Sequence, residues 1–328
     1  MRVIQIGAGQ FGRSWLTRIV PSCQELELVG VVDGNPLALE AVKLQAGLPE
    51  DILFTSLEEA LHRVSPEAAI NVTPPSVHRE VSMQCMAAGV PVLCEKPIAL
   101  NAEDAEELHR QSLASVIPVM IAENYRYAPI VRKLRGLIKE GAIGDIHTVH
   151  VQFFKHHPVF TNYHKDLPFP LLTDVAIHHL DMLRYLTGLE AVSVYARAST
   201  PPGSWYGTRY SDTELLLELE NQVKASYVGS LASFENTGSW LGDWRIEGER
   251  GLLLFDGQQI TLSQKSGKTI YTLEDRIDNR VYVVQEFLNA LRSGRPGETD
   301  ISDNIRTYRI VEAAMESIRM HCAVHIRQ

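Results

Sequence analysis

The chain has 328 residues, of which 45% are hydrophobic and 22% are charged, an ordinary globular composition that is long enough for two domains. A net charge of −9 and a pI near 5.8 argue against anionic partners such as nucleic acids and acidic membrane surfaces. No apolar run approaches the ~18 residues of a membrane-spanning helix. The N-terminus shows no signal peptide and the four cysteines form no CxxC pair, so we expect free thiols and a cytoplasmic location.

The first twelve residues predict a dinucleotide-binding turn. A short apolar strand, Val3 to Ile6, runs directly into G-A-G-Q-F-G, residues 7–12. In a G-x-G-x-x-G turn the glycines permit the tight turn, the approach of backbone to a pyrophosphate, and close packing of the next helix. The helix expected from about Phe11 to Ile19 points its N-terminal N–H groups at the phosphates. We therefore predict cofactor contacts from Gly7, Gly9, Gln10, Phe11, Gly12 and Arg13.

An acidic residue follows the second predicted strand. The apolar run from Leu26 to Val32 ends in Asp33, where a carboxylate can accept hydrogen bonds from the ribose hydroxyls of the cofactor. The same charge would repel the 2′-phosphate of NADP, and the residues that follow, Gly34 to Ala38, include no Arg or Lys. The sequence therefore favours NAD over NADP.

Strands and helices alternate up to about residue 122. Strands are predicted at 26–32, 52–54, 68–72, 90–94 and 119–122, with helical patterns at 36–46, 56–63, 77–88 and 101–113 between them. This alternation is typical of a doubly wound parallel sheet, so we predict a Rossmann domain over residues 1–122. Such sheets bind ligands beyond the carboxyl ends of their strands, where Thr73-Pro74 and Glu95-Lys96-Pro97 fall.

The pattern changes after residue 122. A helix is expected at 129–140, an alternating strand at 146–154 and a helix at 171–186, followed by strands at 191–198, 213–220, 223–234, 242–247, 251–255 and 259–273. Two helices, at 281–291 and 301–320, complete the chain. Successive strands with few helices predict an α+β domain over residues 123–328, built on an open-faced, mostly antiparallel sheet. A bare sheet face favours a homodimer or homotetramer.

Lys96 is the first candidate for chemistry. Pro97 keeps it out of the helical region, and it lies at the lip of the expected cofactor crevice. A lysine there can bind a substrate hydroxyl and help to remove its proton. Its position alone is equally consistent with an ordinary solvated lysine in a loop.

Asp174 and His178 are the second candidates, because they are spaced i and i+4 on an otherwise apolar helix, with Asp181 close to the same stripe. A carboxylate one turn from an imidazole fixes its tautomer and raises its basicity, which suits a general base. The alternative is a structural hydrogen bond that anchors a buried helix. A hydride-transfer cofactor in the same chain favours the base, because alcohol oxidation requires removal of a proton.

These motifs, in this order, resemble the Gfo/Idh/MocA oxidoreductase family, whose namesakes include inositol dehydrogenase and glucose–fructose oxidoreductase. The resemblance covers nearly the whole chain through residues 7–12, Asp33, 73–78, 94–97, 122–129, 141–146 and 174–181. Two departures are visible. Ala176 stands where the family usually has glycine, and Phe169-Pro170-Leu171-Leu172 replaces a frequent Gly-Gly pair, which puts close substrate analogies in doubt.

The resemblance implies a nicotinamide placed over the open-faced sheet. It implies that Lys96 and His178 handle the proton, that Asp174 orients His178 and the substrate, and that the Lys96–Pro97 peptide is cis. It also matches Thr73, Pro74, His78 and Glu95 to family positions around the ribose and the nicotinamide.

Several further side chains are weaker candidates. Tyr125 and Arg126 follow a strand end and could reach substrate, although packing at the domain linker explains them as well. His150 would contact substrate if its strand face is turned to the cleft. The histidines between residues 147 and 164 lack the spacing of metal ligands, so we expect no metal site.

These observations predict an NAD-dependent dehydrogenase that transfers a hydride between nicotinamide and a secondary alcohol of a sugar, cyclitol or related polyol. The alternatives are an oxidoreductase or redox-assisted lyase that retains and recycles its NAD(P), and a non-catalytic NAD(H)-binding sensor.

Overall fold

The computed structural model describes residues 1–158, 167–235, 238–274 and 277–327. Packing divides the chain into two units, Met1–Asn124 with Ile277–Ile305, and Tyr125–Arg276 with Arg306–Gln328. The sequence predicted an uninterrupted second domain over residues 123–328. The structure assigns Ile277–Ile305 to the first unit instead.

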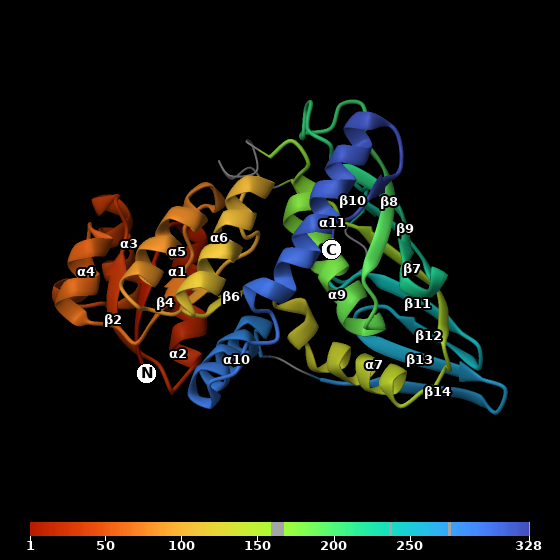
Figure 1. The fold of residues 1–328 in the computed structure, drawn as a ribbon, viewed down its shortest axis with the longest axis horizontal. Coiled ribbons are helices and arrows are strands. Elements are labelled where there is room, and N and C mark those ends of the chain that lie inside the picture. The colour runs from red at the N-terminus through yellow and green to blue at the C-terminus, as the bar shows by residue number, and fades with distance from the viewer. Residues whose placement is uncertain (159–166, 236–237, 275–276, 328) are drawn as a thin grey trace. The chain divides into compact units, whose positions relative to one another are not determined.

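The first unit contains a six-stranded sheet in the order β3-β2-β1-β4-β5-β6, with every neighbouring pair parallel (Figure 1). Its strands are β1 (Arg2–Ile6), β2 (Glu27–Val32), β3 (Leu53–Phe54), β4 (Ala68–Asn71), β5 (Val92–Cys94) and β6 (Val119–Ile121). The central strands β4 and β5 are buried along their whole length, as expected of parallel strands covered on both faces. This is the predicted doubly wound Rossmann arrangement.

The helices of the first unit begin where the sequence places polar caps. The side chains of Asn35, Ser56 and Asn101 each accept a hydrogen bond from a backbone N–H in the first turn of α3, α4 and α6. The helices are α1 (Gln10–Ser14), α2 (Val20–Ser22), α3 (Pro36–Ala46), α4 (Leu57–Val64), α5 (His78–Ala87), α6 (Ala102–Ser115) and α10 (Asn279–Ser293). A π-helical segment, Trp15–Ile19, joins α1 to α2, so the helix after the glycines is longer and less regular than predicted.

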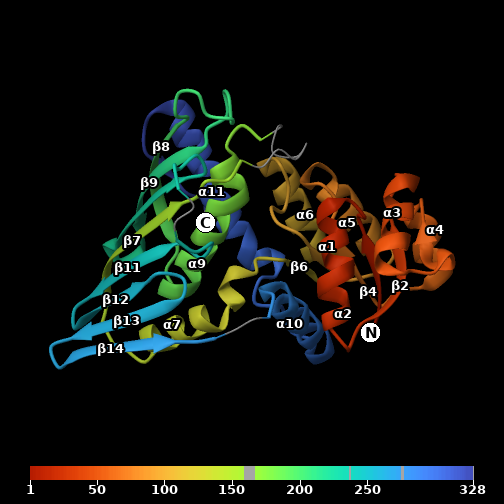
Figure 2. The same ribbon diagram turned by 180° about the vertical axis from the view of Figure 1, so that it is seen from behind.

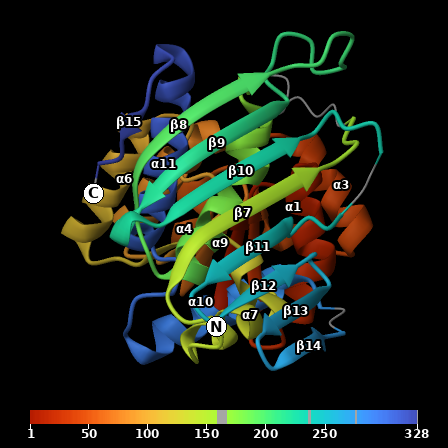
Figure 3. The same ribbon diagram turned by 90° about the vertical axis from the view of Figure 1, so that its right-hand side faces the viewer.

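The second unit contains a nine-stranded sheet in the order β14-β13-β12-β11-β7-β10-β9-β8-β15 (Figure 3). Only β7 and β10 pair in parallel among the described strands; the other neighbours are antiparallel. The strands are β7 (Ile146–Phe154), β8 (Ala191–Ser199), β9 (Asp212–Leu219), β10 (Lys224–Ser230), β11 (Asp243–Gly248), β12 (Gly251–Phe255), β13 (Gln259–Gln264), β14 (Gly267–Thr272) and β15 (Val324–His325). The predicted strand at 259–273 is therefore a hairpin, β13–β14.

Helices cover one face of this second sheet. Figures 1 and 2 show α7 (Pro129–Lys139), α9 (Ile177–Thr187) and α11 (Ile301–Met320) on the same side of it. A π-helical segment, Leu171–Ala176, leads into α9. Along β7 the side chains of Val149, Val151 and Phe153 are buried, whereas His150 and Gln152 are exposed on the opposite face. In the described part of the chain no helix lies over that opposite face (Figure 3). The predicted two-part fold class is confirmed.

Among the described residues, no helix combines the length and apolar character that crossing a bilayer requires.

Candidate functional site

The glycine turn after β1 is packed closely at two of its three glycines. Gly7 adopts φ +101°, and a Cβ there would lie 2.5 Å from the carbonyl oxygen of Val72. A Cβ on Gly12 would lie 2.2 Å from the carbonyl oxygen of Gly7, so both positions require glycine. A Cβ on Gly9 would meet no atom within 4 Å, which leaves open space beside its backbone. The backbone is therefore closely packed at Gly7 and Gly12, and there is open space beside it at Gly9.

Asp33 lies at the end of β2, next to this turn. Its Oδ2 accepts a hydrogen bond from the Ala8 N–H at 2.8 Å, and its Oδ1 accepts one from the Asn35 N–H at 2.9 Å. Each carboxylate oxygen has a further lone pair. Asp33 therefore holds the glycine turn and keeps lone pairs for a further donor; its predicted contact with the ribose stays a prediction.

The helix start offers exposed side chains to a ligand. Gln10 and Phe11 are exposed, with Phe11 52% accessible, while Arg13 is half-buried in the first turn. Sequence reasoning missed Arg280 on α10, whose guanidinium lies over the Phe11 ring at 5.2 Å and donates to Ser14 Oγ at 2.9 Å. No local signal links Arg280 to this turn, because the two segments are more than 260 residues apart.

The loops after β4 and β5 carry the next group of predicted residues. Pro74 is exposed and Thr73 half-buried, with the Thr73 hydroxyl donating to Asn71 Oδ1 at 2.6 Å. Lys96 is half-buried, and the Lys96–Pro97 peptide is cis, as the family resemblance implied. The two strands are hydrogen-bonded neighbours, so both loops leave the same edge of the sheet.

Two residues of this group face inward. Glu95 is 7% exposed; its Oε1 accepts a hydrogen bond from the Trp15 indole at 2.9 Å, and its Oε2 accepts one from the Lys96 N–H at 3.2 Å. His78 is fully buried, with Nδ1 2.8 Å from the Pro97 carbonyl oxygen and Nε2 2.8 Å from that of Thr73. This contradicts the prediction that His78 contacts the cofactor, because both ring nitrogens already face protein atoms.

In the second unit, the π-helical segment and α9 carry the proposed acid–base residues. Asp174 lies in the π-helical segment and is half-buried, and His178 lies in the first turn of α9 and is 5% exposed. π-Helical turns are rare and occur frequently at functional sites. The His178 ring stacks on the Tyr125 ring, with centroids 4.1 Å apart and planes inclined by 16°. Tyr125 thus adjoins the candidate base, and its contact with substrate stays a prediction.

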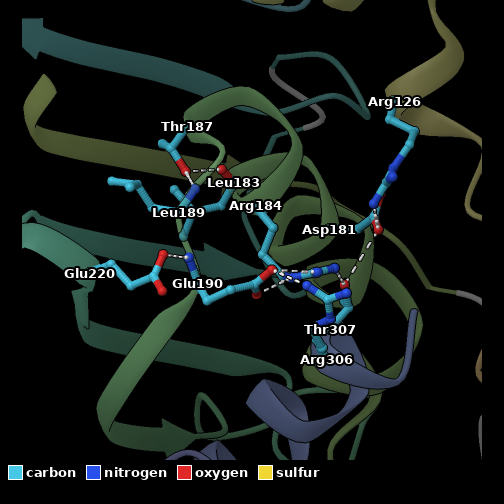
Figure 4. Close-up of polar contacts among 10 residues, drawn as sticks. All are labelled: Arg126, Asp181, Leu183, Arg184, Thr187, Leu189, Glu190, Glu220, Arg306 and Thr307. Carbon is cyan, nitrogen blue, oxygen red and sulfur yellow. Dashed lines mark hydrogen bonds and ion pairs between the residues drawn. The ribbon is translucent and has the colours of Figure 1, made fainter. Parts of the chain in front are cut away.

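Arg126, the neighbour of Tyr125, has a different place from the predicted one. Its guanidinium is buried and binds both carboxylate oxygens of Asp181 on α9, with Nε 2.7 Å from Oδ2 (Figure 4). Thr307 of α11 also donates to Asp181 Oδ1, at 3.4 Å. This contradicts the prediction that Arg126 reaches substrate. It also shows that Asp181 belongs to a buried ion pair.

His150 is likewise misplaced for substrate. It is exposed on the uncovered face of the sheet, where its Nδ1 lies 2.7 Å from Ser226 Oγ. On the buried face, Phe153 packs against His179 of α9, with ring centroids 5.1 Å apart. The sheet therefore separates His150 from His178, which contradicts a shared substrate contact.

Tyr206 is a site neighbour that the sequence did not reveal. It is buried in the loop between β8 and β9, and its hydroxyl donates to the His157 carbonyl at 2.8 Å. Burial raises the pKa of Tyr206 to about 12, and the charge of Asp174 adds to the effect. A tyrosine in a long loop carries no sequence signal of such proximity.

The histidines near residue 150 form no metal centre in the described structure. No group of three His, Cys, Asp or Glu side chains there could hold an ion. His164 lies outside the described residues.

The comparisons with known proteins agree with these features. The profile of an oxidoreductase family with an NAD-binding Rossmann fold, GFO_IDH_MocA, matches residues 1–114, and that of the GFO/IDH/MocA C-terminal domain matches residues 131–254. An uncharacterized protein of Sinorhizobium fredii, y4oX, is 27% identical over 100% of this chain and 96% of its own. An inositol 2-dehydrogenase of Arthrobacter sp. is 24% identical over 97% and 93%.

A solved structure shares the whole fold. It is an oxidoreductase of Agrobacterium radiobacter in complex with NAD+, L-tartaric acid and magnesium, with a TM-score of 0.91, 22% identity, and coverage of 99% of this chain and 98% of that one. The two family matches span most of both units, and the motifs that carried the resemblance lie largely within them. The chain therefore belongs to the Gfo/Idh/MocA family of oxidoreductases, whose Rossmann domain binds NAD.

Proposed function

We propose that this oxidoreductase is an NAD-dependent dehydrogenase acting on a secondary alcohol of a sugar, cyclitol or related polyol. The observation that carries the proposal is a nearly buried imidazole, His178, which stacks on Tyr125 and follows Asp174 by four residues. A general base is what alcohol oxidation requires of the protein. The similarity to an inositol 2-dehydrogenase supports the polyol part of the proposal.

The residues of the first unit fit a dinucleotide. The open space at Gly9, the exposed start of α1 and the Asp33 carboxylate adjoin one another, because β1 and β2 end side by side. The backbone from Gly7 to Arg13 would bind the pyrophosphate, and Asp33 would bind the ribose. When bound, NAD supplies the nicotinamide carbon that accepts the hydride.

The proton is handled by residues of the chain. His178 accepts the hydroxyl proton of the substrate at a ring nitrogen. Lys96 donates a hydrogen bond to a substrate hydroxyl and stabilises negative charge that develops on its oxygen. Asp174 holds His178 in the required tautomer and binds a second substrate hydroxyl. Tyr125, which stacks on His178, restricts the ring to one orientation.

The deciding experiment uses the absorbance of reduced nicotinamide. The protein is mixed with NAD and a panel of cyclitols, aldoses and sugar acids. Turnover with one class supports the proposal and identifies the substrate class. Silence across the panel, with NAD binding detected by calorimetry, contradicts an exchanging dehydrogenase and favours a retained cofactor, a redox-assisted lyase or a sensor.

Variants separate catalysis from sensing. His178→Ala and Lys96→Ala are each expected to lower kcat by roughly 10²–10⁴-fold, the usual contribution of a positioned acid–base group, and to leave the Kd for NAD nearly unchanged. A wild-type kcat in either variant would remove that residue from the mechanism.

The uncovered sheet face supports a homodimer or homotetramer. Four exposed apolar side chains lie on it, namely Phe154, Leu216, Leu254 and Ile270. Apolar groups spread over a broad, flat face favour association with a second copy of the same face. His150 lies in this face and would belong to that interface.

The cytoplasm is the compartment we propose. All four cysteines are free thiols, and three of them are buried. Free thiols are typical of a reducing compartment.

A further inference from the structure

His78, the first residue of α5, joins two loops of the first unit. The loop after β4 contributes the carbonyl of Thr73, and the loop after β5 contributes the carbonyl of Pro97, the residue that follows Lys96. The imidazole lies between these carbonyls, 2.8 Å from each, and no part of it is exposed to solvent. A fully buried polar ring that bridges two loops is a specific arrangement, and proton transfer at His178 leaves it unused.

The ring can donate only one hydrogen bond near neutral pH. Burial lowers the pKa of His78 to about 4; the Pro97 and Thr73 carbonyls oppose this effect, and the charge of Lys96 adds to it. A neutral imidazole carries a single N–H, so only one of the two carbonyls receives it. The choice of tautomer therefore decides which loop the ring holds.

The Pro97 loop has the greater need of this bond. Thr73 is already anchored, because its backbone N–H and its hydroxyl both donate to Asn71 Oδ1, at 3.2 and 2.6 Å. Pro97 has no N–H, so its carbonyl is the only backbone group through which a hydrogen bond can hold it. The nitrogen that faces this carbonyl is Nδ1.

We propose that His78 is a positioning residue for Lys96. Its Nδ1–H donates to the Pro97 carbonyl and fixes the backbone next to Lys96, so that the ammonium group is held where the substrate oxygen binds. The inference rests on the proposed function, in which Lys96 contacts that oxygen. His78 itself touches neither substrate nor cofactor.

Two substitutions separate the roles of the two ring nitrogens. In His78→Asn the amide nitrogen is as many bonds from Cα as Nδ1, so the donor toward Pro97 is kept. In His78→Gln the amide nitrogen matches Nε2, so the donor faces Thr73 instead. We expect His78→Gln to lower kcat by about 100-fold, the loss typical of a catalytic group misplaced by about 1 Å, with the Kd for NAD unchanged. We expect His78→Asn to retain most of the wild-type kcat.

A double-mutant cycle tests whether His78 acts through Lys96. In the Lys96→Ala background, His78→Gln should cause little further loss, because the group that it positions is absent. Additive losses, or a larger defect in His78→Asn than in His78→Gln, would overturn the inference. A wild-type kcat in Lys96→Ala alone would instead contradict the proposed function, so the two failures are distinguishable.

Two further measurements complete the test. Ser112→Ala removes a partly buried hydrogen bond from α6 to the Ile117 carbonyl, just beyond the end of the helix, and serves as the control for general destabilisation of the unit. It should leave kcat unchanged, and an equal loss of kcat there would reduce His78 to a structural role. Nitrogen NMR of the His78 ring at neutral pH should show the proton on Nδ1. A proton on Nε2 alone would overturn the inference independently of activity.

Discussion

At the scale of single residues, Asp33 connects the glycine turn to the expected choice of cofactor. Its two oxygens accept backbone N–H groups of Ala8 and Asn35, which fixes the carboxylate at the end of β2. The side chain is therefore held in place before any ligand binds. In the proposed function this fixed negative charge binds the ribose and favours NAD, because the 2′-phosphate of NADP would meet like charge there.

Asp33→Ala should accordingly weaken NAD binding and relax discrimination against NADP. The lost charge-assisted hydrogen bond is worth about 1.5–3 kcal/mol, or roughly 10- to 100-fold in the Kd for NAD. Calorimetric titration with both dinucleotides measures the effect. Asn35→Ala is the matched control, since it removes the cap of α3 but keeps the acid. An unchanged ratio of the two Kd values would exclude Asp33 from the ribose site.

His78 should make stability depend on pH. Its folded pKa is about 4, lowered chiefly by burial, whereas an unfolded histidine titrates near 6.5. As pH falls from about 6.5 to 4 the unfolded chain binds a proton and the folded chain does not. The stability contributed by the neutral ring is therefore complete above pH 6.5 and is lost toward pH 4, by roughly 3 kcal/mol in all.

Denaturant unfolding at pH 7.5 and pH 4.5 checks this expectation. The wild-type protein should lose more stability between the two values than His78→Asn, which has no group titrating in that range at this position. Equal losses in the two proteins would show that the buried ring does not govern the acid side of the stability curve.

Local spacing predicted the close-packed glycines Gly7 and Gly12, which the structure confirms, since they belong to a short motif; the roles of Asp33, Asp174 and His178 rest on motifs of the same kind and stay predictions. The same reasoning misassigned Arg126, because its partner Asp181 is 55 residues away and a buried ion pair has no local signature. His78 also matched a family position, yet only the structure shows that its ring points into the protein. Sequence motifs therefore identify candidate functional residues better than they predict which atoms those residues contact.

At the scale of elements, a buried polar network anchors α9. Arg184 donates to Glu190 through Nε at 2.6 Å and to Thr307 at 2.9 Å, and Thr307 donates to Asp181, which binds Arg126 (Figure 4). The network ties the helix that carries His178 to α11 and to the turn that carries Tyr125. The stacking of Tyr125 on His178 thus depends on the buried ion pair between Arg126 and Asp181.

Asp181→Asn should destabilise the second unit by about 3–5 kcal/mol, because it leaves the guanidinium of Arg126 buried without its counter-charge. Chemical denaturation measures this loss. The double variant Arg126→Met/Asp181→Leu removes both charges and should be markedly more stable than Asp181→Asn. Thr307→Val removes the hydrogen bond from Arg184 and the longer one to Asp181 but leaves the Arg126–Asp181 charges paired, so it should cost less than Asp181→Asn, about 1–3 kcal/mol. A double variant no more stable than Asp181→Asn would contradict this account.

Periodicity predicted some elements well and others poorly for physical reasons. The bounds of β7 and α11 match their predictions, because one alternates strictly over a half-buried face and the other has a long helical pattern. The hairpin β13–β14 was predicted as one strand, since only Lys265 and Ser266 separate its two strands. The π-helical segments had no signal, because a single wider turn leaves the apolar spacing nearly intact.

At the scale of the whole molecule, Ile277–Ile305 belongs to the first unit because it makes contacts with residues that are distant in sequence. Thr299 donates its hydroxyl to the Ile121 carbonyl at 2.6 Å, and Arg292 forms an ion pair with Glu25 at 2.9 Å. These contacts join segments more than 170 residues apart. Local sequence patterns do not indicate contacts this distant in sequence, so the segment was predicted to belong to the same domain as the residues that precede it.

The uncovered face of the nine-stranded sheet leads to a prediction about the oligomeric state. Leu216 lies on β9 and is 62% exposed. It is paired with Ser226 of β10, which is in turn paired with His150 of β7 at the centre of that face. If two copies pair through it, a charge at Leu216 would be buried against the partner without a counter-ion, which costs several kcal/mol. Leu216→Glu should therefore shift the protein toward monomer, measured by light scattering over a dilution series.

Leu113 provides the matched control for that experiment. It lies on α6 of the first unit and is 61% exposed, so Leu113→Glu adds the same charge at the same exposure away from the sheet. That variant should keep the wild-type mass. Equal masses for both variants and the wild-type protein would rule out pairing through the sheet face, and a wild-type monomer would rule out the oligomer itself. A shift confined to Leu216→Glu would instead place His150 in an interface between subunits, which accounts for a histidine exposed on the face opposite His178.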